Sequence, residues 1–595
     1  MTPTRTLPLL TAVTTLVTLE LLRLAGTSGS VAGAVFALLA AAPAGPLVWW
    51  LGPRRALPAA LGVLALARLV VQLPAARTVP VTALAAGVAL AALLLTVRAC
   101  AATSGNGPGR AARALALAVA ADVALRLRLD LLDPVWHGGV AGWLWALLLA
   151  APLAAGAREL YRRPGEGAGG GGVELALLGP ALALYAVLFA SPAFVAAEAG
   201  WSVAAGLAIA AGSVLGVAAL SLPLPPWAPP AALLTAAVAF TLLPDLAAPA
   251  AALALAALPA ALRRLLAMPR LRTGRGALLD LALAAAGAAL GYGLLVLAFH
   301  LRFLAGPLCV LAALGLAWAA TRGAAPRRLG HAWTPVVLAT LLLAVPQLAN
   351  ALRGGPAPLP EDTAGGMYRL LSWNVHHAVD GEGELAPEAL LEVIRGSGAQ
   401  VVVLQEVPRG WPGAGGLDLA HWLERRLDVT AVWAPAADRQ FGNLILTSLP
   451  VVDSETVGLP RAGGDMDRSY ASVTVRLTDG EEARIVGTHL DGGDSPDARQ
   501  AQLEPLLRGT GDGRHTVLAG DLNARPGTGE IDAVEAAGLR SAQDEIGDPD
   551  RDTATSPPRR VDWIFGAAGI AFGDFRLLDS AASDHLPLAV TVYLD

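Results

Sequence analysis

Polar side chains that can perform chemistry recur at the ends of short apolar runs in the last 230 residues of the chain. They are Asn374 in Ser-Trp-Asn-Val-His, Glu406 in Leu-Gln-Glu-Val, His489 in Thr-His-Leu-Asp, Asp521 and Asn523 in Gly-Asp-Leu-Asn, Asp562 in Arg-Val-Asp-Trp, and Asp584 and His585 in Ser-Asp-His-Leu-Pro. Carboxylate and amide oxygens suit a hard divalent cation, and imidazoles suit proton transfer and donation to phosphoryl oxygens. The series therefore indicates metal-assisted chemistry on a phosphate.

The elements that must position these residues are short strands separated by helices. Apolar runs predict strands at residues 368–375, 401–407, 443–446, 471–477, 483–489, 516–520, 561–565 and 586–594. Helical periodicity falls between them, at residues 387–396, 419–427, 495–507 and 529–537. The pattern predicts a strand-rich domain of mixed α/β class with polar residues at the strand ends.

The motifs together resemble those of the endonuclease/exonuclease/phosphatase superfamily, which includes abasic-site endonucleases, sphingomyelinases and inositol polyphosphate 5-phosphatases. The resemblance covers essentially all of residues 366–595. A lone Gly-Asp-x-Asn string is a weak signal, whereas a series of such motifs in the family's order across one domain is a strong one. The resemblance implies an α/β two-sheet sandwich with its site at one edge.

The resemblance also implies a cation site and a phosphate site. Glu406 matches the principal Mg²⁺ ligand, with Mn²⁺ as the alternative ion, and Asn374 and Asp584 match further ligands or positioning residues. Arg468 in Asp-Arg-Ser-Tyr and Asn443 in Phe-Gly-Asn-Leu are weaker matches for phosphate contacts.

The remaining matched residues are those that would orient water, transfer protons or donate to the phosphoryl group. Asp521 and Asn523 match the pair that orients the attacking water and holds the phosphate. His585, oriented by Asp562, matches either the general base or a donor to the phosphoryl oxygens, and the sequence does not decide between these roles. His489 matches the Thr-His of the sphingomyelinase-like branch and would donate to the charge developing on phosphorus.

Each residue also has a plainer interpretation. A strand-end Asn or Asp is often a turn former, so a single motif carries little weight. His376, His377 and His421 lie off the pattern, and we expect them to be surface histidines.

The composition of the whole chain points to lipid as its main solvent. Of its 595 residues 55% are hydrophobic and 15% charged, and the mean hydropathy is +0.55. Residues before Gly366 include 24 basic and 12 acidic ones, whereas the remainder has 19 basic and 36 acidic ones, a formal charge of −17. We therefore expect a multi-pass membrane region over 1–350, a linker over 351–365 and a water-soluble domain over 366–595.

Apolar runs of membrane-spanning length predict about thirteen helices in the membrane region. They are expected near 7–26, 30–51, 56–75, 79–97, 111–130, 138–156, 173–196, 201–222, 229–245, 247–263, 277–300, 303–321 and 332–350. With the N-terminus inside, the cytoplasmic connections hold 17 Arg and the opposite ones six. The predicted topology is a cytoplasmic N-terminus and an extracytoplasmic C-terminal domain in the cell membrane.

The charge of the C-terminal domain and its attachment to the membrane restrict which substrates and binding partners we expect. A nuclease needs a basic surface, so the acidic domain disfavours nucleic acid. Both cysteines precede the domain, which excludes a thiolate metal site there. We expect a phosphohydrolase that meets membrane lipids and acts on a lipid-linked phosphate.

Two alternatives remain open at this stage. The helices could form a transporter, flippase or sensor with a regulatory outer domain, or the domain could be an extracellular nuclease. Support for the first comes from ionisable residues at membrane depth, which are Glu20, Arg68, Asp122, Glu174 and Asp280, a scatter with no matching pair evident in the sequence. The oligomeric state does not follow from the sequence.

Overall fold

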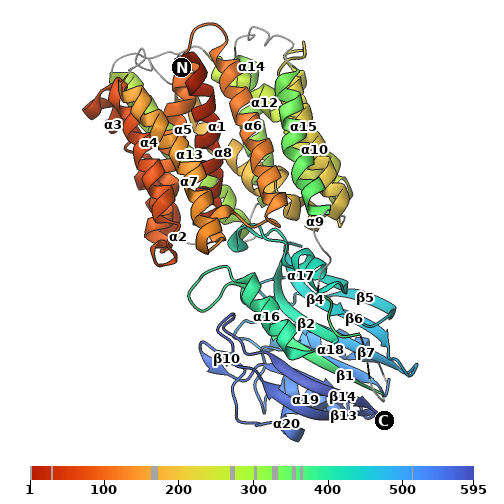
Figure 1. Cartoon of the computed structure of the whole chain (residues 1–595). Coiled ribbons are helices and arrows are strands. Elements are labelled where there is room, and N and C mark those ends of the chain that lie inside the picture. Colours follow the sequence, from red (N-terminus) through yellow and green to blue (C-terminus); the bar gives the residue numbers. More distant parts are fainter. Residues whose placement is uncertain are drawn as a thin grey trace. The chain divides into compact units, whose positions relative to one another are not determined.

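The chain forms two compact units in the computed structural model (Figure 1). The structure describes residues 3–27, 31–162, 172–200, 202–268, 275–300, 305–323, 333–351, 357–361, 363, 366–437, 439–511 and 513–595. The helical unit comprises Met1–Arg353 with Gly415–Leu417, and the C-terminal unit comprises Gly354–Ala414 with Asp418–Asp595. Much of the predicted linker, and several of the Arg residues used for the topology, lie outside the described residues.

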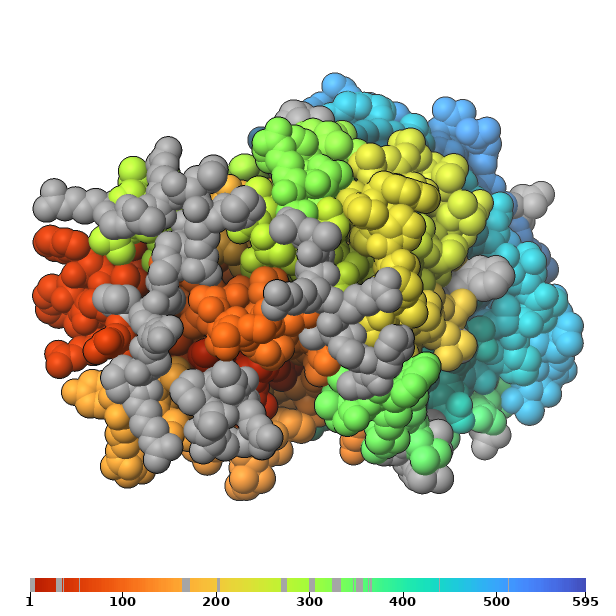
Figure 2. Space-filling view, turned by 90° about the horizontal axis from the view of Figure 1, so that it is seen from above, coloured from red at the N-terminus to blue at the C-terminus, as the bar shows by residue number. Residues whose placement is uncertain are grey.

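Helices of six to 26 residues build the helical unit, and they are rich in Ala and Leu, residues of high helix propensity. They are α1 (Pro3–Gly26), α2 (Val31–Ala41), α3 (Ala44–Leu51), α4 (Pro53–Val70), α5 (Val79–Ala101), α6 (Gly107–Arg128), α7 (Gly139–Arg162), α8 (Leu178–Ala183), α9 (Pro192–Ala199), α10 (Ser202–Ala219), α11 (Ala228–Leu242), α12 (Ala247–Leu266), α13 (Arg275–His300), α14 (Ala305–Arg322) and α15 (Thr334–Ala351). Helices distant in sequence pack together, as α15 does against α6 and α10. Figure 2 shows one face of the molecule on which early, middle and late segments of this unit crowd together.

Six helices of the described chain are long and apolar enough to cross a membrane. A seventh span results if the bent pair Val173–Phe189 and Pro192–Ala199 counts as one. Helices occur in all thirteen predicted segments, but several are shorter, broken or more charged than a span requires; the segment 30–51, for example, divides into α2 and α3. The helical unit is thus compatible with a multi-pass membrane protein, and its topology stays a prediction.

Two buried arginines in the interior of the helical unit form ion pairs with carboxylates. The Arg23 guanidinium donates to Asp122 at 2.6 Å and to Asp133 at 2.7 Å. Arg68 donates to the two carboxylate oxygens of Glu20 at 2.6 and 2.9 Å. The expected scatter without matching pairs is wrong for these residues, because α1, α4 and α6 bring together charges that are far apart in the sequence.

The C-terminal unit contains two six-stranded sheets. The first sheet has the order β13 (Ile570–Leu577), β14 (Leu588–Leu594), β1 (Met367–Asn374), β2 (Val401–Pro408), β4 (Phe441–Thr447) and β3 (Thr430–Ala436). The second sheet has the order β5 (Val451–Leu459), β6 (Arg468–Arg476), β7 (Glu482–His489), β8 (Thr516–Asp521), β12 (Asp562–Gly566) and β9 (Arg540–Ser541). A separate hairpin joins β10 (Ala554–Thr555) to β11 (Pro558–Arg559).

An apolar core lies between the two sheets, and helices cover the outside. Val403 and Ile445 of the first sheet share a buried cluster with Val473 and Ile485 of the second. The helices of this unit are α16 (Pro387–Ser397), α17 (Leu419–Leu427), α18 (Asp497–Thr510), α19 (Gly529–Ala536) and α20 (Ala542–Ile546). Apolar side chains of α18 and α19 form a second cluster with β7, β8 and β12. The predicted two-sheet α/β sandwich is confirmed.

Breaking one of the buried ion pairs should destabilise the helical unit. Arg68→Ala leaves the Glu20 carboxylate buried without its partner, which we expect to cost about 3–5 kcal/mol and to lower the thermal midpoint of the full-length protein in detergent micelles. Arg55→Ala, an exposed site on the same helix α4, serves as the control. Glu20→Gln combined with Arg68→Met should recover most of the loss; an unchanged midpoint in Arg68→Ala would contradict the pairing.

Candidate active site

Three neighbouring strands of the second sheet bring His489, Asp521 and Asp562 side by side. In the strand register Asp521, at the end of β8, lies beside His489 at the end of β7 and beside Asp562 at the start of β12. The three side chains are buried, and the His489 Nε2 lies 3.5 Å from an Asp521 carboxylate oxygen. The polar strand ends predicted from the sequence thus meet at one edge of this sheet.

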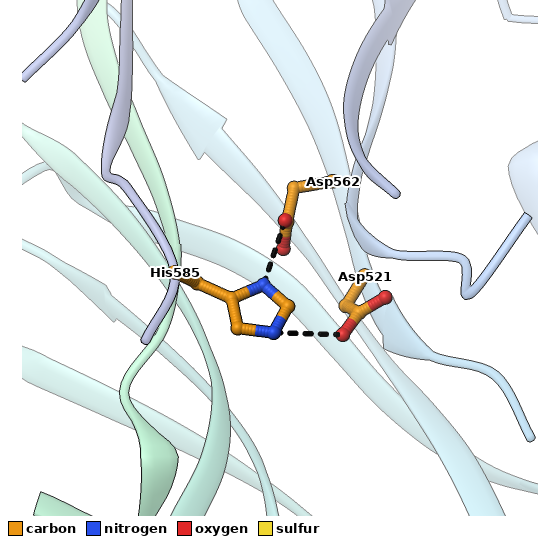
Figure 3. Close-up of side chains that lie close together, drawn as sticks. All are labelled: Asp521, Asp562 and His585. Carbon is orange, nitrogen blue, oxygen red and sulfur yellow. Dashed lines mark hydrogen bonds and ion pairs between the residues drawn. The ribbon is translucent and has the colours of Figure 1, made fainter. Parts of the chain in front are cut away.

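The imidazole of His585 lies between two carboxylates (Figure 3). Its Nδ1 is 2.7 Å from Asp562 Oδ2, and its Nε2 is 4.0 Å from Asp521 Oδ2. The Thr553 hydroxyl donates to the same Asp562 oxygen at 2.7 Å and accepts the Asp562 backbone N–H at 3.0 Å. The Trp373 indole donates to the His585 carbonyl at 2.8 Å, so both the ring and its backbone are fixed.

The electrostatics of this group suit proton transfer near neutral pH. Burial and then repulsion from Asp562 raise the pKa of Asp521 to about 7. Burial alone would lower the pKa of His585, but the carboxylates of Asp562 and Asp521 raise it above its usual range. The arrangement therefore pairs an imidazolium donor with a carboxylate that can accept a proton.

Asn523 links Asp521 to His489. Its backbone N–H donates to Asp521 Oδ1 at 2.8 Å, and its side-chain amide donates to His489 Nε2 at 3.0 Å. The residue has a φ of +48°, a left-handed conformation that Asn tolerates better than most residues. Burial and then the charge of Arg468 lower the pKa of His489 well below its usual range, so this imidazole is neutral.

The first sheet contributes Asn374 at the end of β1. Its side-chain amide donates to Asp521 Oδ2 at 3.0 Å, and its carbonyl oxygen Oδ1 accepts the backbone N–H of His376 at 3.1 Å. Asn374 therefore joins the end of one sheet to the carboxylate of the other.

Glu406 comes from an irregularity in β2. The register of β2 against β4 shifts between Leu404 and Val407, and Glu406 has a φ of +58°. Such a bulge redirects a side chain at a sheet edge. Burial alone would raise the pKa of Glu406, but the surrounding imidazoles, His377 foremost, lower it to about 2.

The other predicted residues lie at different places around the site. The Asp584 carboxylate is 3.9 Å from the His376 ring. Arg468 is buried at the start of β6, and its charge acts on His489. The Asn443 amide donates to the Ser469 carbonyl at 2.8 Å, so this side chain ties the two sheets together.

Sequence reasoning missed two residues of the site. His377, expected to be a surface histidine, is 22% exposed and lies 3.0 Å from the Glu406 carboxylate, so that expectation is wrong. Thr553 holds Asp562 although it lies in a loop without apolar periodicity. The close spacing of His377 to the strand-end Asn374 was the one available signal, whereas Thr553 had none.

The donor set fits a hard divalent cation. Ligand atoms of Asp521, Asp562 and His585 lie within 4.8 Å of one another, and Glu406 and Asn374 add oxygen atoms nearby. The Asp562 Oδ1 atom is buried and accepts no hydrogen bond from the part of the chain that the structure describes. A cation near these oxygens would satisfy such an atom and offset the buried negative charge.

One family model matches most of the C-terminal unit. Residues 371–585 match the model of the endonuclease/exonuclease/phosphatase family, which generally hydrolyses phosphoester bonds and is typically dependent on a divalent metal. No curated protein matches the chain.

Several solved structures are similar to part of the chain. An endonuclease/exonuclease/phosphatase from Beutenbergia cavernae is 26% identical, with 38% of this chain and 72% of that one covered and a TM-score of 0.35. A functionally unknown conserved protein from Enterococcus faecalis is 20% identical, with 38% and 100% covered and a TM-score of 0.33. A humanized D. rerio TDP2 is 19% identical, with 38% and 99% covered and a TM-score of 0.33.

The raised pKa of Asp521 predicts that its ionised carboxylate destabilises the folded protein. The protonated carboxyl contributes stability below about pH 4, and this contribution is lost as the pH rises through about 7. Asp521→Asn should therefore be more stable than the wild type at pH 8 in EDTA, by about 1–3 kcal/mol, with the gain disappearing by pH 4. Thermal unfolding of the full-length protein at both pH values measures this.

Asp544→Asn provides the control of opposite sign. Burial would raise the pKa of Asp544, but hydrogen bonds from Arg560 lower it, so this variant should lose stability at pH 8. Loss of stability at pH 8 in Asp521→Asn as well would contradict the electrostatic argument.

Proposed function

We propose that this chain is a membrane-tethered, divalent-metal-dependent hydrolase that acts outside the cytoplasm on a lipid-linked phosphate. The observation that carries the proposal is the buried Asp521–His585–Asp562 arrangement, flanked by Asn374 and Glu406. The match of residues 371–585 to a family of phosphoester hydrolases supports it. Mg²⁺ is the proposed ion, with Mn²⁺ as the alternative.

The side chains have distinct proposed roles. Glu406, Asn374 and Asp584 hold the cation, which would supply positive charge to the phosphoryl oxygens. Asp521 takes the proton from the attacking water, because its pKa lies near neutrality, and Asn523 fixes the Asp521 carboxylate. Of the two candidates for the general base, the proposal therefore assigns this role to Asp521 and not to His585.

The histidines act on the phosphoryl group. His585 is anchored through Nδ1 to Asp562, and its Nε2–H, 4.0 Å from Asp521 Oδ2, can donate to a phosphoryl oxygen or the leaving group. His489 is neutral and accepts from Asn523 at Nε2, which puts its hydrogen on Nδ1. Arg468, next to it, adds positive charge to this side of the site.

Membrane attachment and charge favour a lipid substrate. The six apolar helices would hold the C-terminal unit at the bilayer, where lipid head groups have a high effective concentration. A formal charge of −17 after Gly366 disfavours a nucleic acid backbone. The transporter alternative loses support, because Glu20, Arg68 and Asp122 are satisfied by ion pairs.

Turnover by the full-length protein tests the proposal. In detergent micelles, the protein should release phosphate or head group from a polyprenyl or glycerolipid phosphate, pyrophosphate or phosphodiester with Mg²⁺ and not with EDTA. We expect Glu406→Ala and His585→Ala to lower kcat by about 10²–10⁴-fold, because each removes a group that acts on the transition state.

The control is Glu424→Ala, which removes a half-exposed carboxylate that pairs with His421 on α17. Its turnover should equal that of the wild type. Cleavage of DNA alone would replace the lipid substrate with nucleic acid, and unchanged turnover in Glu406→Ala would refute the assigned site.

A further inference from the structure

We propose that His377 is a positioning residue whose imidazole holds the Glu406 carboxylate in the orientation that binds the divalent cation. The inference rests on the proposed function, since it concerns the cation of that site. His377 Nδ1 lies 3.0 Å from Glu406 Oε2, and the two side chains are 22% and 19% exposed. The contact is therefore short and largely shielded from water.

The backbone around His377 follows an uncommon path. His376, His377 and Ala378 have φ values of +41°, +55° and +65°, three consecutive residues in the left-handed region. L-residues with side chains rarely adopt this conformation, and it persists only where the surrounding structure holds it. Such a turn places His377 against Glu406 rather than in solvent.

Hydrogen bonds tie this left-handed turn to the strand that carries Glu406. The Val375 N–H donates to the carbonyl of Gln405 at 3.1 Å, one residue before Glu406. The Ala378 N–H then closes the turn on the Val375 carbonyl at 2.9 Å. Because Glu406 itself has a φ of +58°, both partners of the contact lie in left-handed backbone. Strained conformations of this kind cluster at functional sites.

Aromatic neighbours fix the plane of the His377 ring. The Trp411 ring meets it at 77° with centroids 4.7 Å apart, and the Phe441 ring lies 5.4 Å away. A ring held on two sides loses little further freedom when its Nδ1 contacts the carboxylate. The position of Nδ1 relative to Glu406 is thus set by packing.

The proposed role depends on the two carboxylate oxygens of Glu406 having different partners. With Oε2 in contact with the imidazole, Oε1 is left to face the cation. Residues that contact a metal-binding side chain help to fix its orientation, and their loss typically weakens metal affinity by about 10–100-fold. A role in packing alone would leave that affinity unchanged.

Two substitutions separate positioning from packing. His377→Phe keeps a ring against Trp411 and Phe441 but removes the Nδ1 atom that contacts Glu406, and His377→Leu is a second variant without that atom. His377→Asn places an amide nitrogen close to the position of Nδ1. His421→Phe, at an imidazole that pairs with Glu424 and is 37% exposed, is the matched control.

Isothermal titration of Mg²⁺ into the full-length protein in detergent micelles is the measurement. We expect His377→Phe and His377→Leu to raise the Kd for Mg²⁺ at least about tenfold, and His377→Asn to stay within about threefold of the wild type. The Mg²⁺ concentration for half-maximal turnover should rise by the same factor, with kcat recovering at saturating Mg²⁺. Thermal unfolding in EDTA checks that each variant is folded.

The positioning role would be overturned if His377→Phe bound Mg²⁺ with wild-type affinity, or if His377→Asn lost as much Mg²⁺ affinity as His377→Phe. Either result would leave the proposed function standing. A wild-type protein that binds Mg²⁺ but hydrolyses no phosphate would refute the function while the affinity comparison still decides on His377. Absence of Mg²⁺ binding to the wild type would overturn both.

Discussion

Two carboxylates buried on adjacent strands are the constraint on which the C-terminal unit depends. Asp521 and Asp562 face each other across β8 and β12 with almost no exposure, an arrangement that repulsion and desolvation both oppose. The His585 imidazole between them, the Thr553 hydroxyl and the Asn374 amide supply the compensating donors. These donors come from a loop before β14, from the β10 region and from the first sheet, so much of the unit must fold correctly before the site can form. The raised pKa of Asp521 reflects the repulsion and burial that these donors do not offset, and it suits the role of base proposed for this carboxylate.

The edge of the sandwich is shaped by local strain as much as by regular structure. Asn374 and His489 end regular strands, but Glu406 depends on a bulge, Asn523 on a left-handed residue, and His377 on a left-handed turn. Regular strands alternate their side chains between two faces, and they alone would not aim all these groups at one point. Hydrogen bonds such as the one from Asn443 to Ser469 tie the two sheets together and help hold these conformations in place.

The helical unit follows the same rule of charge compensation. Its interior is built from small and aliphatic side chains, in which an unpaired ion would be costly. Arg23 meets two aspartates, and Arg68 meets Glu20, each within hydrogen-bond distance. These pairs join α1 to α4 and α6, so buried charge here serves packing specificity.

The sequence by itself determined the two-part organisation, the two-sheet α/β class and the order of the motifs. All eight predicted strands occur, and they are the inner strands of the two sheets. The strands that the sequence did not reveal are the four edges, β3, β5, β9 and β13, and the separate hairpin of β10 and β11. Inner strands are covered on both faces and read as apolar runs, whereas β5 is largely exposed and β13 is interrupted by an irregularity, so their patterns are weak. Only the tertiary structure decided which charges meet: the partners of Glu20 and Asp122, the approach of His377 to Glu406, and the place of Thr553 behind Asp562. Such contacts join residues brought together by strand register, bulges and helix packing, and the periodicity of a sequence does not encode these distances.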